Sequence, residues 1–232
     1  YDFESFDKSI HKLWCVNDKN FIREFTNLAI NIKHLYIADG HHRIGAMQHI
    51  KKINPLIERF MIAAFPSNEC KIFDYNRVIK DLNGLSKDQF IKNLSNDFKV
   101  LKVDKAYKPS TKNHFGMYHD NQWYILEFIN SLTSNNFIDA LDINILNQFC
   151  LTKMLNIKDV NNDERIRFIA GCHGLSALEK KVDENPDSVA FSIFPSKITD
   201  VIRVADNNLT MPPKSTWFDP KPLDGLVVYE FN

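Results

Sequence analysis

The sequence predicts an α+β fold, α/β in the broad sense, with mixed sheets flanked by helices. Two observations lead to this prediction. Stretches with apolar residues at helical spacing alternate along the chain with short apolar or alternating stretches typical of strands. The 232 residues are 44% hydrophobic and 25% charged, which is globular composition with enough apolar mass for a core.

The first third of the chain is expected to combine three short strands with two helices. The strands are expected at residues 10–16, 35–38 and 60–65, and the helices at residues 20–32 and 42–53. Asn17 or Asp18 is suited to cap the first helix, and Trp14 is expected to anchor the core. Residues 60–65 are almost wholly apolar, which predicts a buried central strand.

The rest of the chain is predicted to form further short helices and strands. We expect a helix at 87–98 capped by Ser86, and a β-hairpin of 114–119 and 122–128 whose turn holds Asp120 and Asn121. Strands are expected at 70–78, 166–170, 189–194 and 225–229, helices at 142–153, 174–182 and 198–206, and a loop at 210–222. A polar stretch at 103–113 suggests two portions, 1–102 and 103–232, packed into the same unit.

Charge and composition narrow the classes of function. The chain has 29 basic and 29 acidic residues and no net charge, which disfavours nucleic acid as a partner. Four cysteines match no zinc pattern, so no structural metal is expected. No stretch resembles a membrane span or a signal peptide, which predicts a cytoplasmic protein without a membrane partner. The oligomeric state is left open.

The segment from Asp39 to Arg43 is the strongest functional candidate. A strand ends, Gly40 permits a turn, and a helix begins, whose first amides have no intrahelical partner and lie at the positive end of the helix dipole. Such a helix start binds anions, and His41, His42 and Arg43 add cationic or donor groups there. The sequence therefore predicts a phosphate site at Gly40, His41, His42 and Arg43.

Other interpretations of this segment stay open. It can be an ordinary capped helix with surface histidines, or part of a zinc site, although adjacent His side chains point in different directions. Asp39 does not fit a phosphate site as its neighbours do, because a carboxylate repels phosphate. It can cap the helix, orient a His, bind Mg²⁺ or act as a base.

Several motifs resemble the bacterial and archaeal "domain of unknown function 1015" family. The signature Ile37-Ala38-Asp39-Gly40-His41-His42-Arg43 comes first. Further motifs follow in the family's order: Asp74-Tyr75-Asn76-Arg77-Val78, Leu141-Asp142 with Leu146, Arg165 with Phe168 and Gly171, Ala190-Phe191 with Pro195, and Ala205-Asp206. The block Met211 to Phe218, with Pro220-Lys221 and Gly225-Leu226, is the most specific. Family members are longer at the N-terminus, so a truncated chain is expected.

A more distant resemblance is to the ParB/sulfiredoxin-like fold, on which free serine kinases are also built. In that fold a strand-turn-helix binds nucleotide phosphates, and Gly40-His41-His42-Arg43 stands at the corresponding turn. The sulfiredoxin Cys is absent here, which argues against sulfinic-acid chemistry. This resemblance implies a strand-turn-helix core, and the resemblance to the domain of unknown function 1015 family implies a small-molecule context.

Two further groups are candidates for the same ligand. Asn76 and Arg77 end a predicted strand and can form a second wall of the pocket or a structural salt bridge and turn. Lys214, Ser215 and Thr216 lie on a proline-stiffened loop suited to phosphate or carboxylate, which can instead simply pin the C-terminal strand.

The leading hypothesis is a phosphate- or nucleotide-binding protein that acts as a nucleotide-dependent phosphotransferase on a serine-like small molecule. Asp39 and His41 would be catalytic, and the expected cofactors are ATP/ADP or CTP with Mg²⁺. The alternatives are a non-catalytic sensor of a nucleotide or phosphorylated metabolite, and a ParB-like protein associated with nucleic acid.

Overall fold

The computed structural model describes residues 1–6, 8–132 and 136–230. The chain forms two compact units, Tyr1–Ala38 and Asp39–Asn232. The first unit has an antiparallel pair, β1 (Asp2–Glu4) and β2 (Ile10–Lys12), followed by α1 (Lys19–Ala29). The predicted cap is confirmed, since the Asp18 carboxylate accepts a hydrogen bond from the Phe21 amide at 2.8 Å.

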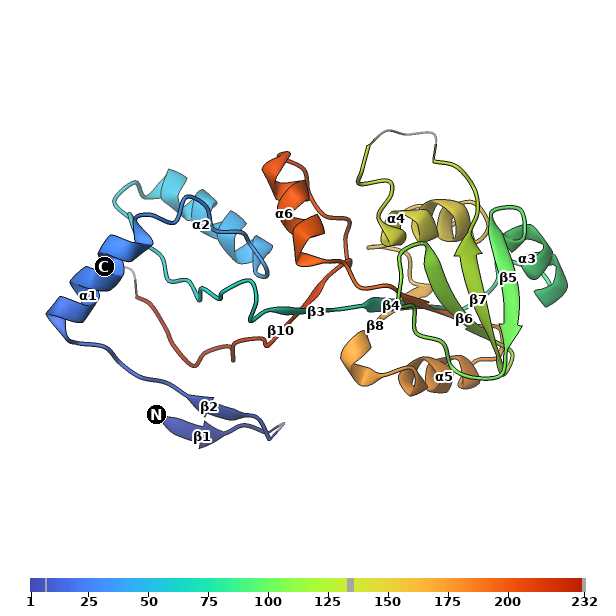
Figure 1. Cartoon of the computed structure of the whole chain (residues 1–232), viewed down its shortest axis with the longest axis horizontal. Coiled ribbons are helices and arrows are strands. Elements are labelled where there is room, and N and C mark those ends of the chain that lie inside the picture. The colour runs from blue at the N-terminus through green and yellow to red at the C-terminus, as the bar shows by residue number, and fades with distance from the viewer. Residues whose placement is uncertain (7, 133–135, 231–232) are drawn as a thin grey trace. The chain divides into compact units, whose positions relative to one another are not determined.

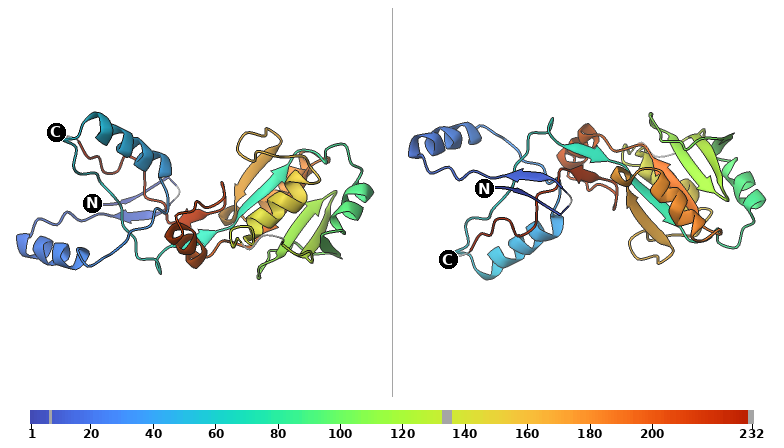
Figure 2. Two further views of the ribbon diagram at one scale, coloured as in Figure 1. Left: turned by 90° about the horizontal axis from the view of Figure 1, so that it is seen from above. Right: turned by 90° about the horizontal axis from the view of Figure 1, so that it is seen from below.

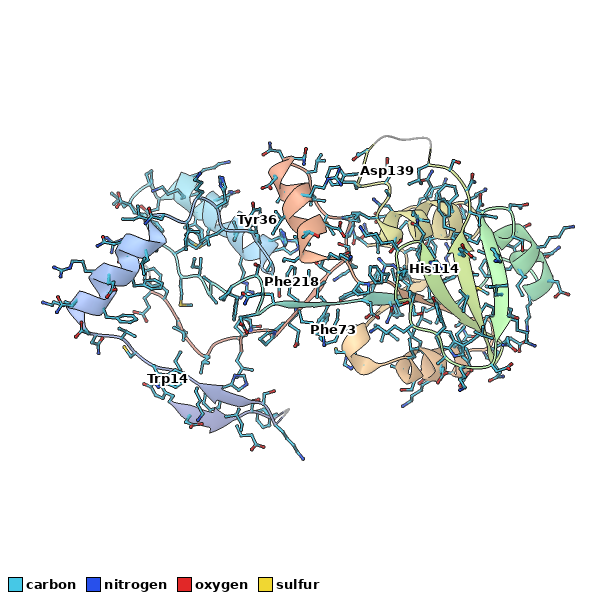
Figure 3. All side chains as sticks on the ribbon, viewed as in Figure 1. Trp14, Tyr36, Phe73, His114, Asp139 and Phe218 are labelled. Carbon is cyan, nitrogen blue, oxygen red and sulfur yellow. The ribbon has the colours of Figure 1, made fainter. Side chains whose placement is uncertain are left out.

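The predicted core role of Trp14 is wrong, because its side chain is 75% exposed (Figure 3). A core anchor needs a second apolar layer to pack against. The short hairpin and α1 do not supply one within this unit, since no residue of α1 is buried.

The second unit is built on a six-stranded sheet with the order β5-β7-β6-β9-β4-β8. Its strands, in chain order, are β4 (Tyr75–Ile79), β5 (Phe98–Val103), β6 (His114–His119), β7 (Gln122–Phe128), β8 (Ile166–Ala170) and β9 (Val189–Ile193). Every pairing in this sheet is antiparallel. The α+β class is therefore confirmed in its antiparallel form, and the sheet draws strands from both sides of residue 103.

Helices cover both faces of the sheet (Figures 1 and 2). One face packs against α3 (Lys87–Leu94), α4 (Asp142–Leu146), the π-helical turn Asn147–Thr152 and α6 (Ile198–Asp206), with Phe90, Leu146, Phe115 and Phe191 in its core. The other face packs against α5 (Ser176–Asp183) through Leu178 and Val182. The alternating strand residues thus reach two separate apolar layers.

Local sequence rules predicted most of these elements. The hairpin β6–β7 and the elements β8 and α6 have the predicted bounds, and Ser86 forms a capping box with Gln89. The helix expected to continue to residue 98 ends at Leu94, because Phe98 pairs with Phe128 and starts β5. The strand expected at 70–78 is divided at buried Asp74 into β3 (Lys71–Phe73) and β4.

Three predicted strands, at residues 35–38, 60–65 and 225–229, are wrong. A strand requires a neighbouring backbone to complete its hydrogen-bond ladder, and no ladder forms along these segments in the described part of the chain. The expected buried strand at 60–65 is instead exposed, including Phe60 and Phe65. The loop expected at 210–222 contains a short strand, β10 (Trp217–Asp219), which pairs with β3.

Asp142, at the start of α4, gives a pH-dependent contribution to stability. Burial raises its pKa to about 6 from 3.8, although the Asn113 amide donates a hydrogen bond to it at 2.6 Å. Between about pH 4 and 6 the folded protein therefore holds a proton that the unfolded chain has released. The stability contributed by this carboxyl falls as pH rises through that window.

Asp142→Asn is consequently expected to be more stable than the wild type above pH 6, by up to about 3 kcal/mol. Near pH 3.5 the two proteins should be close in stability, because the wild-type carboxyl is then protonated. Urea unfolding at a series of pH values measures the difference. A difference that does not change between these two conditions would contradict a buried, raised-pKa carboxyl.

Candidate functional site

Gly40, before α2 (His41–Ile53), permits the turn that the sequence predicts, although the strand expected to precede it does not form. Gly40 is the N-cap residue and adopts a left-handed conformation, with φ 81° and ψ 29°, which residues with a side chain rarely adopt. No side chain caps the first amides of α2, and its first turn holds no acidic residue. The helix start is therefore open to an external acceptor.

Arg43 folds back over this turn. A Cβ atom placed on Gly40 would lie 3.0 Å from Nε and 3.1 Å from Nη2 of Arg43. The guanidinium thus lies against the backbone that precedes the helix, and glycine leaves the space for it. His41, His42 and Arg43 are all exposed.

Two residues from the C-terminal segment complete the turn. Lys221 Nζ donates a hydrogen bond to Asp39 Oδ2 at 2.8 Å, and Arg43 Nη1 lies 3.5 Å from Asp224 Oδ1. Neither Lys221 nor Asp224 was predicted from the sequence to be a site residue. The only signal was that Pro220-Lys221 belongs to the family-like block.

Asp39 is held as a carboxylate. The hydrogen bond from Lys221 keeps its pKa below the usual value despite partial burial, and the Gly40 amide donates a second bond at 2.9 Å. A lowered pKa makes a weak proton acceptor but a good partner for cations. Asp39 therefore suits the orientation of Lys221 or the binding of a metal ion better than the role of base.

Asn76 and Arg77 lie inside the sheet. Asn76 is 1% exposed and uses both ends of its amide: it donates to Asp74 at 2.7 Å and accepts from the Ile193 amide at 3.0 Å. The Arg77 side chain is fully buried, and its guanidinium donates to the carbonyl oxygens of Tyr75 and Lys214. Both side chains therefore fix neighbouring backbone in this structure and do not face solvent.

The burial of Arg77 is energetically costly. Loss of solvent lowers its pKa to about 9, so the group is still charged at neutral pH. Its Nε has no hydrogen-bond partner among the described residues, and Phe168 packs 5.4 Å from the guanidinium carbon. This cation and its bond to the Lys214 carbonyl hold the proline-rich loop against the sheet.

The predicted loop residues differ in their exposure. Lys214 is exposed and has a left-handed backbone with φ 54°. Ser215 is buried, and its carbonyl accepts a hydrogen bond from Ser196 Oγ at 3.1 Å, whereas Thr216 is half-buried. Lys214 and Thr216 are thus accessible to a ligand, and Ser215 is not.

A continuous set of contacts joins this loop to the Gly40 turn. Lys221 extends from Asp39 to the ring of Trp217, 4.6 Å from the ring centroid. The ring centroids of Trp217 and Tyr75 are 5.6 Å apart, and Lys214 Nζ lies 5.9 Å from the Tyr75 ring. The β3–β10 pair aligns these groups, with Phe73 and Phe218 along it (Figure 3).

In the described ranges, no group of three or more His, Cys, Asp or Glu side chains forms a metal-ligand cluster. No helix in the described part of the chain has the length and apolar character needed to cross a membrane.

Comparison with known proteins assigns the chain to a family. The family described as protein of unknown function (DUF1015) matches residues 1–144, which is more than half of the sequence. The chain belongs to this family. The match covers the Gly40 turn and the Asp74–Val78 motif, while Lys214 and Lys221 lie beyond it. No curated protein matches the sequence.

Solved structures resemble this DUF1015 chain at low identity. A point mutant of free serine kinase in complex with ADP is 16% identical, with a TM-score of 0.45, over 78% of this chain and 66% of the kinase. A mutant of free serine kinase in complex with AMP is also 16% identical, with a TM-score of 0.46, over 86% of this chain and 78% of the kinase. A conserved hypothetical protein from Pyrococcus furiosus is 15% identical, with a TM-score of 0.42, over 86% of this chain and 81% of that protein.

Proposed function

We propose that this DUF1015 protein binds the phosphate groups of a nucleotide at the Gly40 turn. The observation that carries the proposal is the Arg43 guanidinium lying over Gly40, at the uncapped start of α2. The planar guanidinium suits two parallel hydrogen bonds to phosphate oxygens, and the first amides of α2 offer more donors. Without an anion, cations at a helix N-terminus are unfavourable, which supports an anionic ligand there.

The neighbouring cations extend the same site. His41 and His42 occupy the first turn of α2, and Lys221 lies beside Asp39. The carboxylates of Asp39 and Asp224 pair with Lys221 and Arg43, and all four side chains are substantially exposed. Exposed pairs of this kind contribute about 0–1 kcal/mol, so a phosphate can replace a carboxylate partner at little cost.

The finer proposal is phosphoryl transfer to the hydroxyl of a serine-like small molecule. Such transfer depends mainly on positioning and on neutralising phosphate charge, which His41, His42, Arg43 and Lys221 would supply. The ionised Asp39 would offer a carboxylate to Mg²⁺, and His41 would be the acceptor for the hydroxyl proton. Lys214 and Thr216 remain the predicted further ligand contacts, and Arg77 would act by positioning Lys214.

Arg43→Ala is expected to weaken nucleotide binding by about ten- to a hundredfold, because charge-assisted hydrogen bonds contribute about 1.5–3 kcal/mol. Calorimetric titrations of the wild type with ATP, ADP, CTP and phosphoserine, with and without Mg²⁺, provide the measurement. Arg59→Ala is the matched control, since it removes an exposed arginine outside the turn.

Equal binding to the wild type and Arg43→Ala, or no binding to either, would show that the turn is not a phosphate site. Turnover is tested separately by nucleotide hydrolysis or transfer with serine as the acceptor. A nucleotide that binds but is never turned over would favour the sensor function.

A further inference from the structure

An aromatic strip, formed by Phe73, Trp217 and Tyr75, lies along one face of the β3–β10 pair, within the unit Asp39–Asn232. Trp217 and Phe73 are direct partners in the antiparallel register, so their side chains are on the same face (Figure 3). Tyr75 continues the strip, because its ring centroid is 5.6 Å from that of Trp217. All three side chains are only half-buried. Contiguous aromatic surface that stays accessible to solvent is a mark of binding sites.

Two lysines lie over rings of the aromatic strip. Lys71 Nζ is 4.8 Å from the centroid of the Phe73 ring, and Lys221 Nζ is 4.6 Å from that of the Trp217 ring. Asp219 lies opposite Lys71 in the register, and Lys221 is paired with a carboxylate at the Gly40 turn, so the charges along the strip are balanced. What the strip offers a ligand is therefore its ring faces, which match a flat and uncharged ring system.

Lys221 connects the aromatic strip to the proposed phosphate site. The same Nζ that lies over the Trp217 ring donates a hydrogen bond of 2.8 Å to Asp39, next to Gly40. One ammonium group thus separates the ring from the turn over which Arg43 is folded. A nucleotide has a matching arrangement, because one sugar separates its flat base from its phosphates.

A base can replace Lys221 on the Trp217 ring. Stacking of a base on an aromatic side chain is stronger than the contact of a cation with an exposed ring, so the exchange is favourable. The Lys221 side chain is 43% exposed and can turn from the ring to a phosphate oxygen at the turn. The two events support each other, since the phosphate attracts the ammonium group that the base displaces.

We propose that the aromatic strip holds the base of the nucleotide whose phosphates bind at the Gly40 turn. The base stacks on Trp217, with Phe73 beside it across the β3–β10 pair, and Lys221 moves onto the phosphate. This base site rests on the proposed phosphate site and adds a second point of recognition to it.

AMP and ribose 5-phosphate separate the two points of recognition, because they share the sugar and the phosphate and differ in the base. Calorimetric titration of the wild type is expected to show AMP binding at least about tenfold more tightly than ribose 5-phosphate. A base stacked on Trp217 should also quench the fluorescence of this residue, and the loss of that quenching in Trp217→Phe assigns the signal to it.

Trp217→Leu removes the ring, and Trp217→Phe is the matched control because it keeps a ring at the same position. We expect Trp217→Leu to weaken AMP by about tenfold and to leave ribose 5-phosphate unchanged, whereas Trp217→Phe should keep most of the affinity for AMP. Arg43→Ala should weaken both ligands, so the phosphate site and the base site are tested separately.

The base site is overturned, and the phosphate site kept, if both ligands depend on Arg43 but bind the wild type equally well. It is also overturned if Trp217→Leu binds AMP as the wild type does. A single-stranded oligonucleotide that binds through Trp217 more tightly than AMP would assign the strip to nucleic acid instead. If neither ligand binds the wild type, both sites are wrong. Because AMP and ribose 5-phosphate are compared on the wild type, a variant that does not fold still leaves a decisive result.

Discussion

Arg77→Ala is expected to lower the free energy of unfolding by about 3–5 kcal/mol. The fully buried guanidinium donates to the carbonyls of Tyr75 and Lys214, one in the sheet and one in the C-terminal loop. Truncation removes both bonds and leaves a cavity beside Phe168 in a core that packs from both sides. Chemical denaturation followed by circular dichroism measures the loss.

Two further variants identify the cause of that loss. Arg77→Met fills much of the volume without the charge, so the part of the loss due to the cavity should be recovered while the two carbonyls stay unpaired. Arg59→Ala removes an exposed arginine and should change stability by no more than about 0.5 kcal/mol. A loss below about 1 kcal/mol for Arg77→Ala would contradict the structural role given to this side chain.

Gly116→Ala is expected to lower the free energy of unfolding by about 3 kcal/mol, at the upper end of the usual cost of overpacking. Gly116 lies in the centre of β6, between Ser192 on β9 and Ile125 on β7. A Cβ atom there would overlap Ser192 Oγ and the backbone carbonyl oxygen of Tyr107, and would lie 3.1 Å from the Trp123 ring. The backbone oxygen cannot rotate away as a side chain can, so either β6 or the loop that carries Tyr107 must shift.

Gly45→Ala is the matched control because the same methyl group meets no atom within 4 Å in α2. In the interior of a helix this change should stabilise, by up to about 1 kcal/mol. Urea unfolding monitored by circular dichroism and tryptophan fluorescence compares the two variants, with buried Trp123 beside Gly116 as a local reporter. Equal stability of the two variants would mean that β6 tolerates the extra methyl group.

The elements that the sequence predicted well are those whose signals are local. The hairpin from His114 to Phe128 has turn residues Asp120 and Asn121 with positive φ between alternating strands, and the Ser86 helix start has a complete capping box. These features depend on residues a few positions apart, which a sequence displays directly.

The errors concern pairing between distant segments. The apolar stretches at 35–38 and 60–65 look like strands, but no neighbouring strand completes them in the described structure. β5 was not predicted, and its first residue, Phe98, was expected to end the preceding helix; its pairing with β7 decided the outcome. Apolar periodicity gives a propensity, while a strand exists only where a partner is placed beside it.

The same distinction applies to the candidate site. The sequence by itself determined the helix start at Gly40 with His41, His42 and Arg43, because the left-handed glycine and the basic first turn are consequences of adjacent residues. Only the tertiary structure decided that Lys221 and Asp224 meet this turn, since the chain between Asp39 and Lys221 spans 182 positions. The tertiary structure also decided that Arg77 is buried and supports Lys214. Burial depends on how the whole sheet packs and not on the residues next to Arg77 in the sequence.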